Sequence, residues 1–325
     1  MAIGKASDFK VYQEEFFGGM NEVLMQNADA FNGSSGGAIR FVTQARKGDY
    51  VKESFFKSIS GLITRRVTTS VAAATDLMLE QGENAAVKVN RKIGPVAQTR
   101  DAFRKIGMSP QEMSVLLGAQ WGRAVTLDYL NTSIIALAAA LSAQSGVVTD
   151  KSAASPTTMT HGWLSAALAK FGDNSDNIVA WVMHSKVYFD LLGQAITDKI
   201  TNIADGAIKM GQTPALGRPV IITDSSALVI DGTPDDYVTL GLVAGGAVVE
   251  QSEQQEIVSD DVTGLENLVL RIQGEYAFNV GLKGFSYDYA NGGANPTDGT
   301  IGTASNWDKT SADDKSLAGI YLLTK

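Results

Sequence analysis

The 325-residue chain has no cysteine, so it contains no disulfide bond and no thiolate metal site. It has only two histidines, His161 and His184, which lie 23 residues apart. No HExxH motif and no cluster of histidine with carboxylates occurs, so the residues that hold zinc in proteins are lacking. Proline is scarce, at 7 residues against 33 glycines, which indicates many turns in a β-rich chain. We expect neither a metal nor a cofactor.

Long apolar runs are also lacking. The first residues, 1–7, do not form the apolar core of a signal peptide. The most apolar stretch, 134–141, is too short to cross a bilayer. Hydrophobic content of 44% and charged content of 19% are typical of folded domains, and the length allows one large or two ordinary domains. The sequence therefore predicts a folded protein of the reducing cytoplasm with no membrane association.

The net charge of −8 argues against a protein specialised for gripping nucleic acid, because phosphate binding needs clustered Lys and Arg. The charge is unevenly distributed, however. Residues 1–110 carry 15 basic and 11 acidic side chains, whereas residues 111–325 carry 12 and 24. A basic N-terminal part joined to an acidic body favours two interpretations: contact with nucleic acid, or contact with the acidic body of a neighbouring copy.

The N-terminal third contains several strand-like segments and an arm. Aromatic and apolar residues at near-helical spacing in 1–37 predict either two short core helices or an arm that folds only against partner subunits. Strand-like runs follow at 38–44 and 50–56. Residues 58–95 are predicted to form a long hairpin, with limbs near 62–71 and 86–93 and turn residues at 82–84. An isolated hairpin is marginal in water, so this one needs another surface to lie on.

The strongest local signal is the start of a long helix. Ser109, Pro110 and Glu112 form a capping box with proline at the first helical position, and the helix is predicted to reach about residue 144. An apolar stripe marks its buried face: Leu127, Leu130, Ile134, Leu137 and Leu141. Helices near 160–171 and 186–199 then alternate with strands, among them 178–183, 247–250, 268–276 and 317–323. The pattern indicates an α+β fold.

The search for catalytic chemistry is negative. Ser185 and His184 lie at a strand-to-helix junction, where a hydrolase displays its nucleophile, but no Gly-x-Ser-x-Gly motif surrounds them. Ser185 is better explained as the N-cap of the following helix. No phosphate-binding Gly-Lys-Ser/Thr loop occurs. The acidic residues between 250 and 261 lack the spacing of a calcium loop and are interpreted as a solvated edge: Glu250, Glu253, Glu256, Asp260 and Asp261. We therefore expect a protein that is not an enzyme.

The order of these elements resembles the major capsid proteins of tailed bacteriophages, which share the HK97-like fold. Several stretches look like that family: 178–185 before a Tyr/Leu-rich helix, the Gly-x-Pro-Val strand of 217–224, and 242–247. The return strands of 270–287 and the tail motifs Asn295-Pro296-Thr297 and Asn306-Trp307 resemble it as well. The likeness covers most of residues 38–325, and it is carried by the order of the pieces.

The resemblance implies a domain layout. An N-terminal arm would span 1–37 and the first part of the peripheral domain 38–57. An extended E-loop hairpin would span 58–95. The peripheral domain would continue over 96–174, with its spine helix at 109–144. The axial domain would span 175–265, and the return strands with the second part of the peripheral domain would span 266–325.

The resemblance also implies a function and partners. Such a protein self-assembles into pentamers and hexamers of an icosahedral virion head around double-stranded DNA, in the host bacterial cytoplasm. Scaffolding, portal and decoration proteins are the implied partners, and packaged DNA would be touched without sequence specificity. Inter-subunit contacts are expected from five basic residues of the hairpin: Arg65, Arg66, Lys88, Arg91 and Lys92. Alternatives are an encapsulin-like cellular compartment, a phage tail or decoration protein, and a serine hydrolase using Ser185 and His184.

Overall fold

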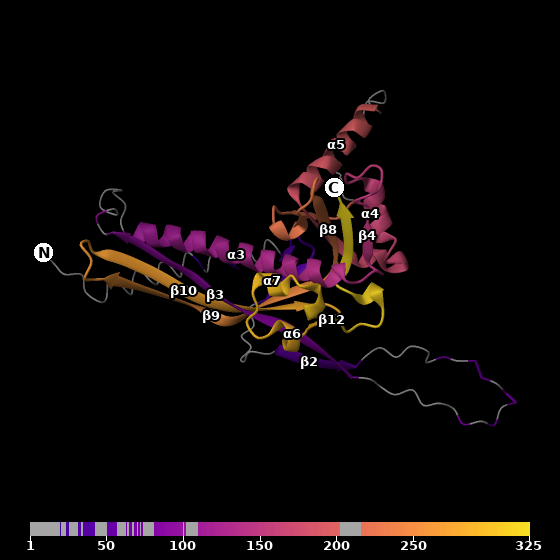
Figure 1. The fold of residues 1–325 in the computed structure, drawn as a ribbon, viewed down its shortest axis with the longest axis horizontal. Helices are drawn as coiled ribbons and strands as arrows, with labels where there is room; N and C mark the ends of the chain where they lie inside the picture. Colours follow the sequence, from indigo (N-terminus) through magenta and orange to yellow (C-terminus); the bar gives the residue numbers. More distant parts are fainter. Residues whose placement is uncertain are drawn as a thin grey trace.

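The computed structural model describes residues 35–42, 51–56, 81–99, 110–201 and 216–325 of the chain, together with a few shorter pieces and single positions: 20, 24–25, 32–33, 63, 65–66, 68–69, 71, 73 and 101. Within this part the molecule has an elongated half and a smaller domain. The elongated half is a long sheet with one helix lying along it, and the smaller domain is a second sheet with its own helices (Figure 1).

The long sheet has five strands in the order β1-β9-β10-β3-β2. Their bounds are β1 (Ile39–Val42), β2 (Val51–Phe56), β3 (Gln81–Thr99), β9 (Ala247–Val262) and β10 (Val269–Leu282). The pairing is antiparallel except between β1 and β9, which run parallel. The turn from β9 to β10 contains Gly264 at φ +86°, a left-handed conformation that favours glycine. Sequentially distant segments thus build one surface.

Helix α3 (Pro110–Ser142) lies along one face of this sheet (Figure 1). Its 33 residues make it about 50 Å long at 1.5 Å per residue. Ile134, Leu137 and Leu141 are completely buried, as the apolar stripe predicts. Leu127 is an error of that prediction, because its side chain is 57% exposed. In this part of the helix the buried side chains are those of Val125 and Tyr129 instead.

The same helix bears on membrane association. Ser114–Ser142 is long and apolar enough to cross a bilayer by length and composition alone, which the short apolar stretch 134–141 did not indicate. However, 56% of its most apolar window is buried inside the molecule. Tyr129 on this helix packs on Phe278 of β10, with ring centroids 4.7 Å apart. Packing against the sheet accounts for the apolar composition.

The smaller domain contains a six-stranded sheet in the order β4-β13-β8-β5-β6, with β7 also paired to β8. Its strands are β4 (Val148–Asp150), β5 (Ile178–Met183), β6 (Val220–Ile222), β7 (Val229–Ile230), β8 (Asp236–Val243) and β13 (Gly319–Thr324). The backbones of β8 and β13 approach closely: a Cβ atom at Gly319 would lie 2.1 Å from the carbonyl oxygen of Gly241. Glycine is required there by close contact.

Short elements complete the molecule. The smaller domain carries helices α4 (His161–Leu168) and α5 (Ser185–Thr201), and α5 points outward from it (Figure 1). A two-stranded sheet links β11 (Phe285–Tyr287) to β12 (Trp307–Lys309), beside the one-turn helices α6 (Tyr289–Gly292) and α7 (Asp298–Ile301). This group is attached to β3, where the backbone N–H of Ala85 donates to Ser286 Oγ at 2.9 Å.

The predicted hairpin limb at 86–93 is wrong, and much of the other predicted limb, 62–71, lies outside the described residues. The hairpin that the structure describes is formed by β2 and the first residues of β3, where Val51 to Phe56 pair with Ala86 to Gln81. Residues 82–84, predicted as turn residues, lie inside that paired strand. Beyond Ala86, β3 pairs with β10 along its remaining length. Val87 and Val89 are buried in the core. Residues 87–95 therefore belong to the long sheet and not to a free hairpin limb.

The expected axial range of 175–265 also differs from the observed sheets. Strand β9, which occupies 247–262, belongs to the long sheet, so the chain leaves the smaller domain near Val243. The smaller domain in turn includes β4, α4 and β13 from the ranges expected to be peripheral. The strands predicted at 247–250 and 268–276 extend in the structure over Ala247–Val262 and Val269–Leu282. The prediction ended too early because charged residues on the exposed face of these strands interrupt the apolar pattern.

Two described residues of the predicted arm pack on their own chain. Met20 is completely buried in a cluster with Trp121, Ile257 and Ile272, and Leu24 packs beside it. For these residues the structure favours the core-helix interpretation over an arm that folds only on a partner. The predicted capping residue Ser109 lies outside the described residues, and Pro110 is the first residue of α3, as predicted.

Candidate assembly surface

The described residues between β2 and β3 are all exposed and pack on no other part of the described chain. We call the described ones the extension: Ile63, Arg65, Arg66, Thr68, Thr69, Val71 and Ala73. Ile63 is 96% exposed and Val71 is 104% exposed. Fully burying an aliphatic side chain is worth about 1.5–3 kcal/mol, and neither of these gains any of it from its own chain. Arg65 and Arg66 are exposed beside them.

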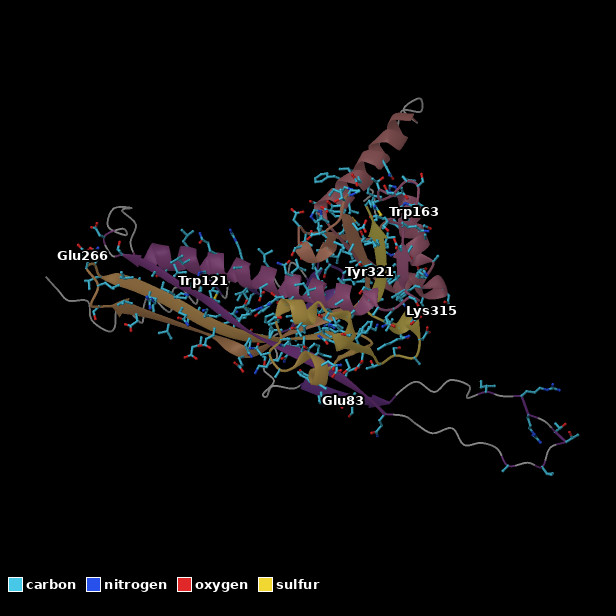
Figure 2. All side chains as sticks on the ribbon, viewed as in Figure 1. Glu83, Trp121, Trp163, Glu266, Lys315 and Tyr321 are labelled. Atoms are coloured by element: carbon cyan, nitrogen blue, oxygen red, sulfur yellow. The ribbon has the colours of Figure 1, made fainter. Side chains whose placement is uncertain are left out.

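The base of the extension is a regular hairpin. Strand β2 pairs with β3 over six residue pairs, and the ion pair between Lys52 and Glu83 closes at 2.7 Å. Both side chains are about half exposed, so the pair contributes roughly 0–1 kcal/mol. Figure 2 shows Glu83 beneath the sheet-and-helix body, close to where this hairpin begins. The extension thus starts from a defined strand pair.

The five basic residues expected at subunit contacts fall into two groups. Arg65, Arg66 and Lys92 are exposed, as a contact with another molecule requires. Lys88 is only 6% exposed and its Nζ lies 2.6 Å from Glu253 of β9 in the same chain. Arg91 is likewise engaged within its own chain. The expectation that Lys88 and Arg91 lie on a free limb is therefore wrong, because β3 is an inner strand of the long sheet.

Arg91 is the centre of a polar network that joins four elements. Its Nε donates to Asp128 of α3 at 3.2 Å, and one guanidinium nitrogen donates to Asp298 of α7 at 2.5 Å and to Thr132 at 3.2 Å. Tyr276 of β10 donates its hydroxyl to the same Asp128 carboxylate at 2.6 Å. Burial lowers the pKa of Arg91, but the Asp298 hydrogen bond and the Asp128 charge outweigh it and raise the pKa. The network fixes α3 on the sheet.

This network was not predicted, although one residue signalled it. Asp128 is the only charged side chain between Arg123 and Asp150, in the most apolar part of the chain. A lone carboxylate in such a helix needs a hydrogen-bonding partner. Its partner on β3 is 37 residues away in sequence and was assigned to the hairpin, so the pair was not recognised.

The Ser185–His184 junction does not form a catalytic pair. Helix α5 begins at Ser185, so His184 occupies the N-cap position, where its Nδ1 accepts a hydrogen bond from the Lys186 N–H at 3.2 Å. Its Nε2 lies 3.6 Å from the Asp224 carboxylate. The prediction that Ser185 is the N-cap is wrong by one residue. Both imidazole nitrogens have partners other than Ser185, which removes the geometric basis of the hydrolase alternative.

The acidic residues of 250–261 lie along β9. Glu253, Glu256 and Asp260 are exposed there, as the interpretation of a solvated edge requires. They are separated along a strand and are not gathered around a point. Among the residues that the structure describes, no group of three or more His, Cys, Asp or Glu side chains is arranged to hold a metal ion.

A long helix on a twisted sheet, a second sheet domain and an extension without support in its own chain together form the architecture of a phage capsid subunit. The fold is similar to the cyanophage Pam1 capsid, with a TM-score of 0.53 and 12% identity over 87% of this chain and 88% of that one. A structure of Mycobacterium phage Bobi has a TM-score of 0.49 and 13% identity, with 87% of this chain and 88% of that one covered. The capsid structure of Helicobacter pylori bacteriophage KHP30 has a TM-score of 0.48 and 11% identity, with 89% of this chain and 88% of that one covered.

A comparison of the sequence with protein families identifies the family of this chain. Residues 8–321 match the family described as major capsid protein 13-like (Gp13-like), and the chain belongs to that family. No curated protein matches the chain. The expected identity as a phage major capsid protein with an α+β, HK97-like fold is confirmed. The protein is a structural component of the phage head, and the family supports a structural role over an enzymatic one.

Proposed function

We propose that copies of this chain form pentamers and hexamers that close into an icosahedral head around double-stranded DNA, and that assembly takes place in the host cytoplasm. The observation that carries this proposal is the extension. A chain that displays Ile63 and Val71 at nearly full exposure, next to Arg65 and Arg66, has an apolar and basic element that its other described residues leave uncovered. In a closed shell every copy offers this element and every copy has a neighbour to receive it.

The charge distribution supports a protein neighbour over nucleic acid as the partner of the extension. The chain has a net charge of −8, and residues 111–325 carry twice as many acidic as basic side chains. Opposite charges on a neighbouring copy steer and align the contact. An acidic wall suits DNA that must be contained and later released. Scaffolding, portal and decoration proteins complete the proposed set of partners.

A charge-reversal variant tests this role. In Arg65→Glu, Arg66→Glu, Lys92→Glu, three exposed basic side chains of each copy become acidic. A single exposed ion pair is worth roughly 0–1 kcal/mol, but three reversals add repulsion at every copy of the interface. We expect a normal circular dichroism spectrum, because none of the three side chains is buried, together with loss of closed particles in electron micrographs.

The matched control is Arg123→Glu, Lys170→Glu, Lys283→Glu, which makes the same change in charge at exposed positions outside the extension and outside β3. Closed, empty particles from the triple variant, with weaker and salt-sensitive DNA retention, would contradict the protein contact and favour the nucleic-acid interpretation.

A further inference from the structure

Two buried polar side chains lie directly opposite each other in the long sheet. Lys88 of β3 pairs with Asn279 of β10, and opposed residues of an antiparallel pair project from the same face of the sheet. Lys88 is 6% exposed and Asn279 is completely buried. Lysine is almost never buried to this degree unless it is paired. The sheet thus holds an amine and an amide side by side on one face, out of solvent.

The Asn279 amide has no role in the hydrogen bonding of the fold. Neither its nitrogen nor its oxygen has a hydrogen-bond partner among the residues that the structure describes. A buried polar group without a partner is costly, and the large majority of buried side-chain amides are bonded. The flanking residues Phe278 and Val280 are buried apolar side chains, and a third one would lack this cost. The presence of an amide here therefore needs another reason.

The ion pair of Lys88 brings its amine across β10. Lys88 Nζ lies 2.6 Å from Oε1 of Glu253, and Glu253 belongs to β9, which lies on the far side of β10 from β3 (Figure 1). Because neighbouring strands are about 4.8 Å apart, the two side chains together bridge about two such spacings above β10. Glu253 is opposite Ala277, which is two residues from Asn279 on the same face. The amine therefore passes over β10 beside the Asn279 amide.

These three side chains supply what a bond between side chains requires: a buried amine, a carboxamide next to it and a carboxylate that moves protons. We propose that Lys88 and Asn279 of one chain become joined by an amide bond, with loss of ammonia and with Glu253 as the proton carrier. The reaction consumes no cofactor and no oxidant. It also gives a covalent tie to a chain that has no cysteine for a disulfide bond.

The protons and bonds of this reaction balance. Glu253 takes one proton from the Lys88 ammonium across their 2.6 Å contact, which leaves a neutral amine. The lone pair of Nζ attacks Cγ of Asn279 and forms the new C–N bond, while the carbonyl electrons move to Oδ1. When these electrons return, the bond from Cγ to Nδ2 breaks. Nδ2 leaves as ammonium with one proton from Nζ and one from Glu253, so the products are a secondary amide and a carboxylate.

The bond joins the two strands that hold the centre of the long sheet. Strand β10 lies between β9 and β3, and β3 lies between β10 and β2. A link from Lys88 to Asn279 closes a loop of about 190 residues and restricts the unfolded chain, as a disulfide does. It also prevents the β3–β10 ladder from opening past this point. The tie acts within one subunit, so it does not depend on the proposed assembly.

The intact mass of the purified full-length protein, measured after denaturation, tests the bond. The chain should weigh about 17 Da less than its sequence, because one ammonia is lost. Lys88→Arg keeps a positive charge beside Glu253 but cannot form this amide, so it should have its full sequence mass, as should Asn279→Ala. Lys92→Arg, the matched control, changes an exposed lysine of the same strand and should keep the deficit. A wild-type chain of full mass overturns the proposal.

Peptide mapping locates the bond and excludes another source of the same mass loss. The Asn-Gly sequences at 32–33 and 291–292 can lose ammonia by cyclising, but this joins no two peptides. Trypsin does not cut after an acylated lysine, so it should release residues 67–91 joined to residues 272–283. Recovery of 67–88 and 272–283 as separate peptides, with the deficit confined to an Asn-Gly sequence, overturns the proposal.

The role of Glu253 is tested by rate. Glu253→Gln changes an exposed residue and keeps a hydrogen-bonding side chain opposite Lys88, but it removes the group that carries the proton. In samples taken at intervals after a pulse of synthesis, the mass deficit should appear at least tenfold more slowly than in the wild-type chain. Circular dichroism checks that the variant is folded. Equal rates overturn the role assigned to Glu253.

Discussion

Two isoleucines of this chain lie in opposite surroundings. Ile134, on α3, is completely buried between helix and sheet, whereas Ile63, in the extension, is 96% exposed. The side chains are identical, so the difference lies in what the fold provides around each of them. Around Ile134 the chain supplies all of the packing. Around Ile63 the described residues supply almost none, and we expect a neighbouring copy to supply it.

The comparison separates residues that fold the subunit from residues that join subunits. In the body, stability comes from packing and from networks such as that of Arg91, all within one chain. In the extension, the same kinds of side chain are held out in solvent, where they contribute little to the stability of a monomer. A change in the body should therefore alter folding, and a change in the extension should alter assembly alone.

The largest expected effect is that of a charge in the body. Ile134→Asp places an unpaired carboxylate in a fully buried position, at a cost of roughly 5 kcal/mol or more. Because a typical domain has only about 5–15 kcal/mol of stability, we expect no soluble folded protein. Ile63→Asp is the matched control and should give a folded subunit by circular dichroism, with loss of particles. A folded, assembling Ile134→Asp would break the comparison.

Alkaline pH should destabilise the body through its buried tyrosines. Burial raises the pKa of Tyr129 to about 12, whereas the unfolded chain has a tyrosine pKa near 10. The stabilising contribution of the protonated hydroxyl is fully present below pH 10 and is lost as the pH rises through 12, by about 3 kcal/mol. Urea unfolding of Tyr129→Phe should show a shallower loss of stability over this range. An unchanged slope would show that Tyr129 ionises as readily in the folded chain as in the unfolded one.

A smaller loss is expected from the network between β3, α3 and α7. Arg91→Met removes hydrogen bonds to two carboxylates and should lower the free energy of unfolding by about 2 kcal/mol, because each bond to a charged group contributes about 1.5–3 kcal/mol and the freed carboxylates are partly solvated. The adjacent change, Lys92→Met, replaces an exposed side chain and should alter the free energy of unfolding by less than about 0.5 kcal/mol. Equal effects of the two changes would show that the network does not stabilise the body.

The smallest effect belongs to the removal of one charge from the extension. Arg65→Ala removes one exposed charge, and an exposed ion pair contributes roughly 0–1 kcal/mol. The midpoint of urea unfolding should be unchanged, and electron microscopy should show closed particles in nearly normal yield. A complete loss of particles would mean that Arg65 is a buried hot spot of the contact, which would sharpen the distinction between body and extension further.

The main helix and several strands were predictable because each carries a local signal. Pro110 and Glu112 mark a helix start, and Ile134, Leu137 and Leu141 recur at helical spacing. The strand at 178–183 is an apolar run that is buried almost throughout. Such features depend on residues within a few positions of one another.

The features that were missed depend on distant residues. The path of β3 is determined by pairing with β10, which is more than 160 residues away, and no local pattern shows that Lys88 meets Glu253. The mixed composition of 82–84 resembles a turn because one face of this strand is exposed. The direct opposition of Glu256 and Glu275 is likewise a consequence of register, since the two residues become neighbours only when β9 and β10 pair. The capsid family was accessible from the sequence because the order of its motifs spans the whole chain.

The smaller domain is discontinuous in the chain, with a consequence for how the protein unfolds. Strand β8 ends at Val243, the chain then builds β9 to β12, and it returns at Gly319 to place β13 between β4 and β8. Neighbouring strands of one sheet are thus separated by about 170 residues in the case of β4 and β13. Contacts between residues so far apart in sequence slow folding. Because the chain passes through the long sheet between β8 and β13, the two halves are also coupled to each other. We therefore expect calorimetry of the subunit to show a single cooperative transition in place of two.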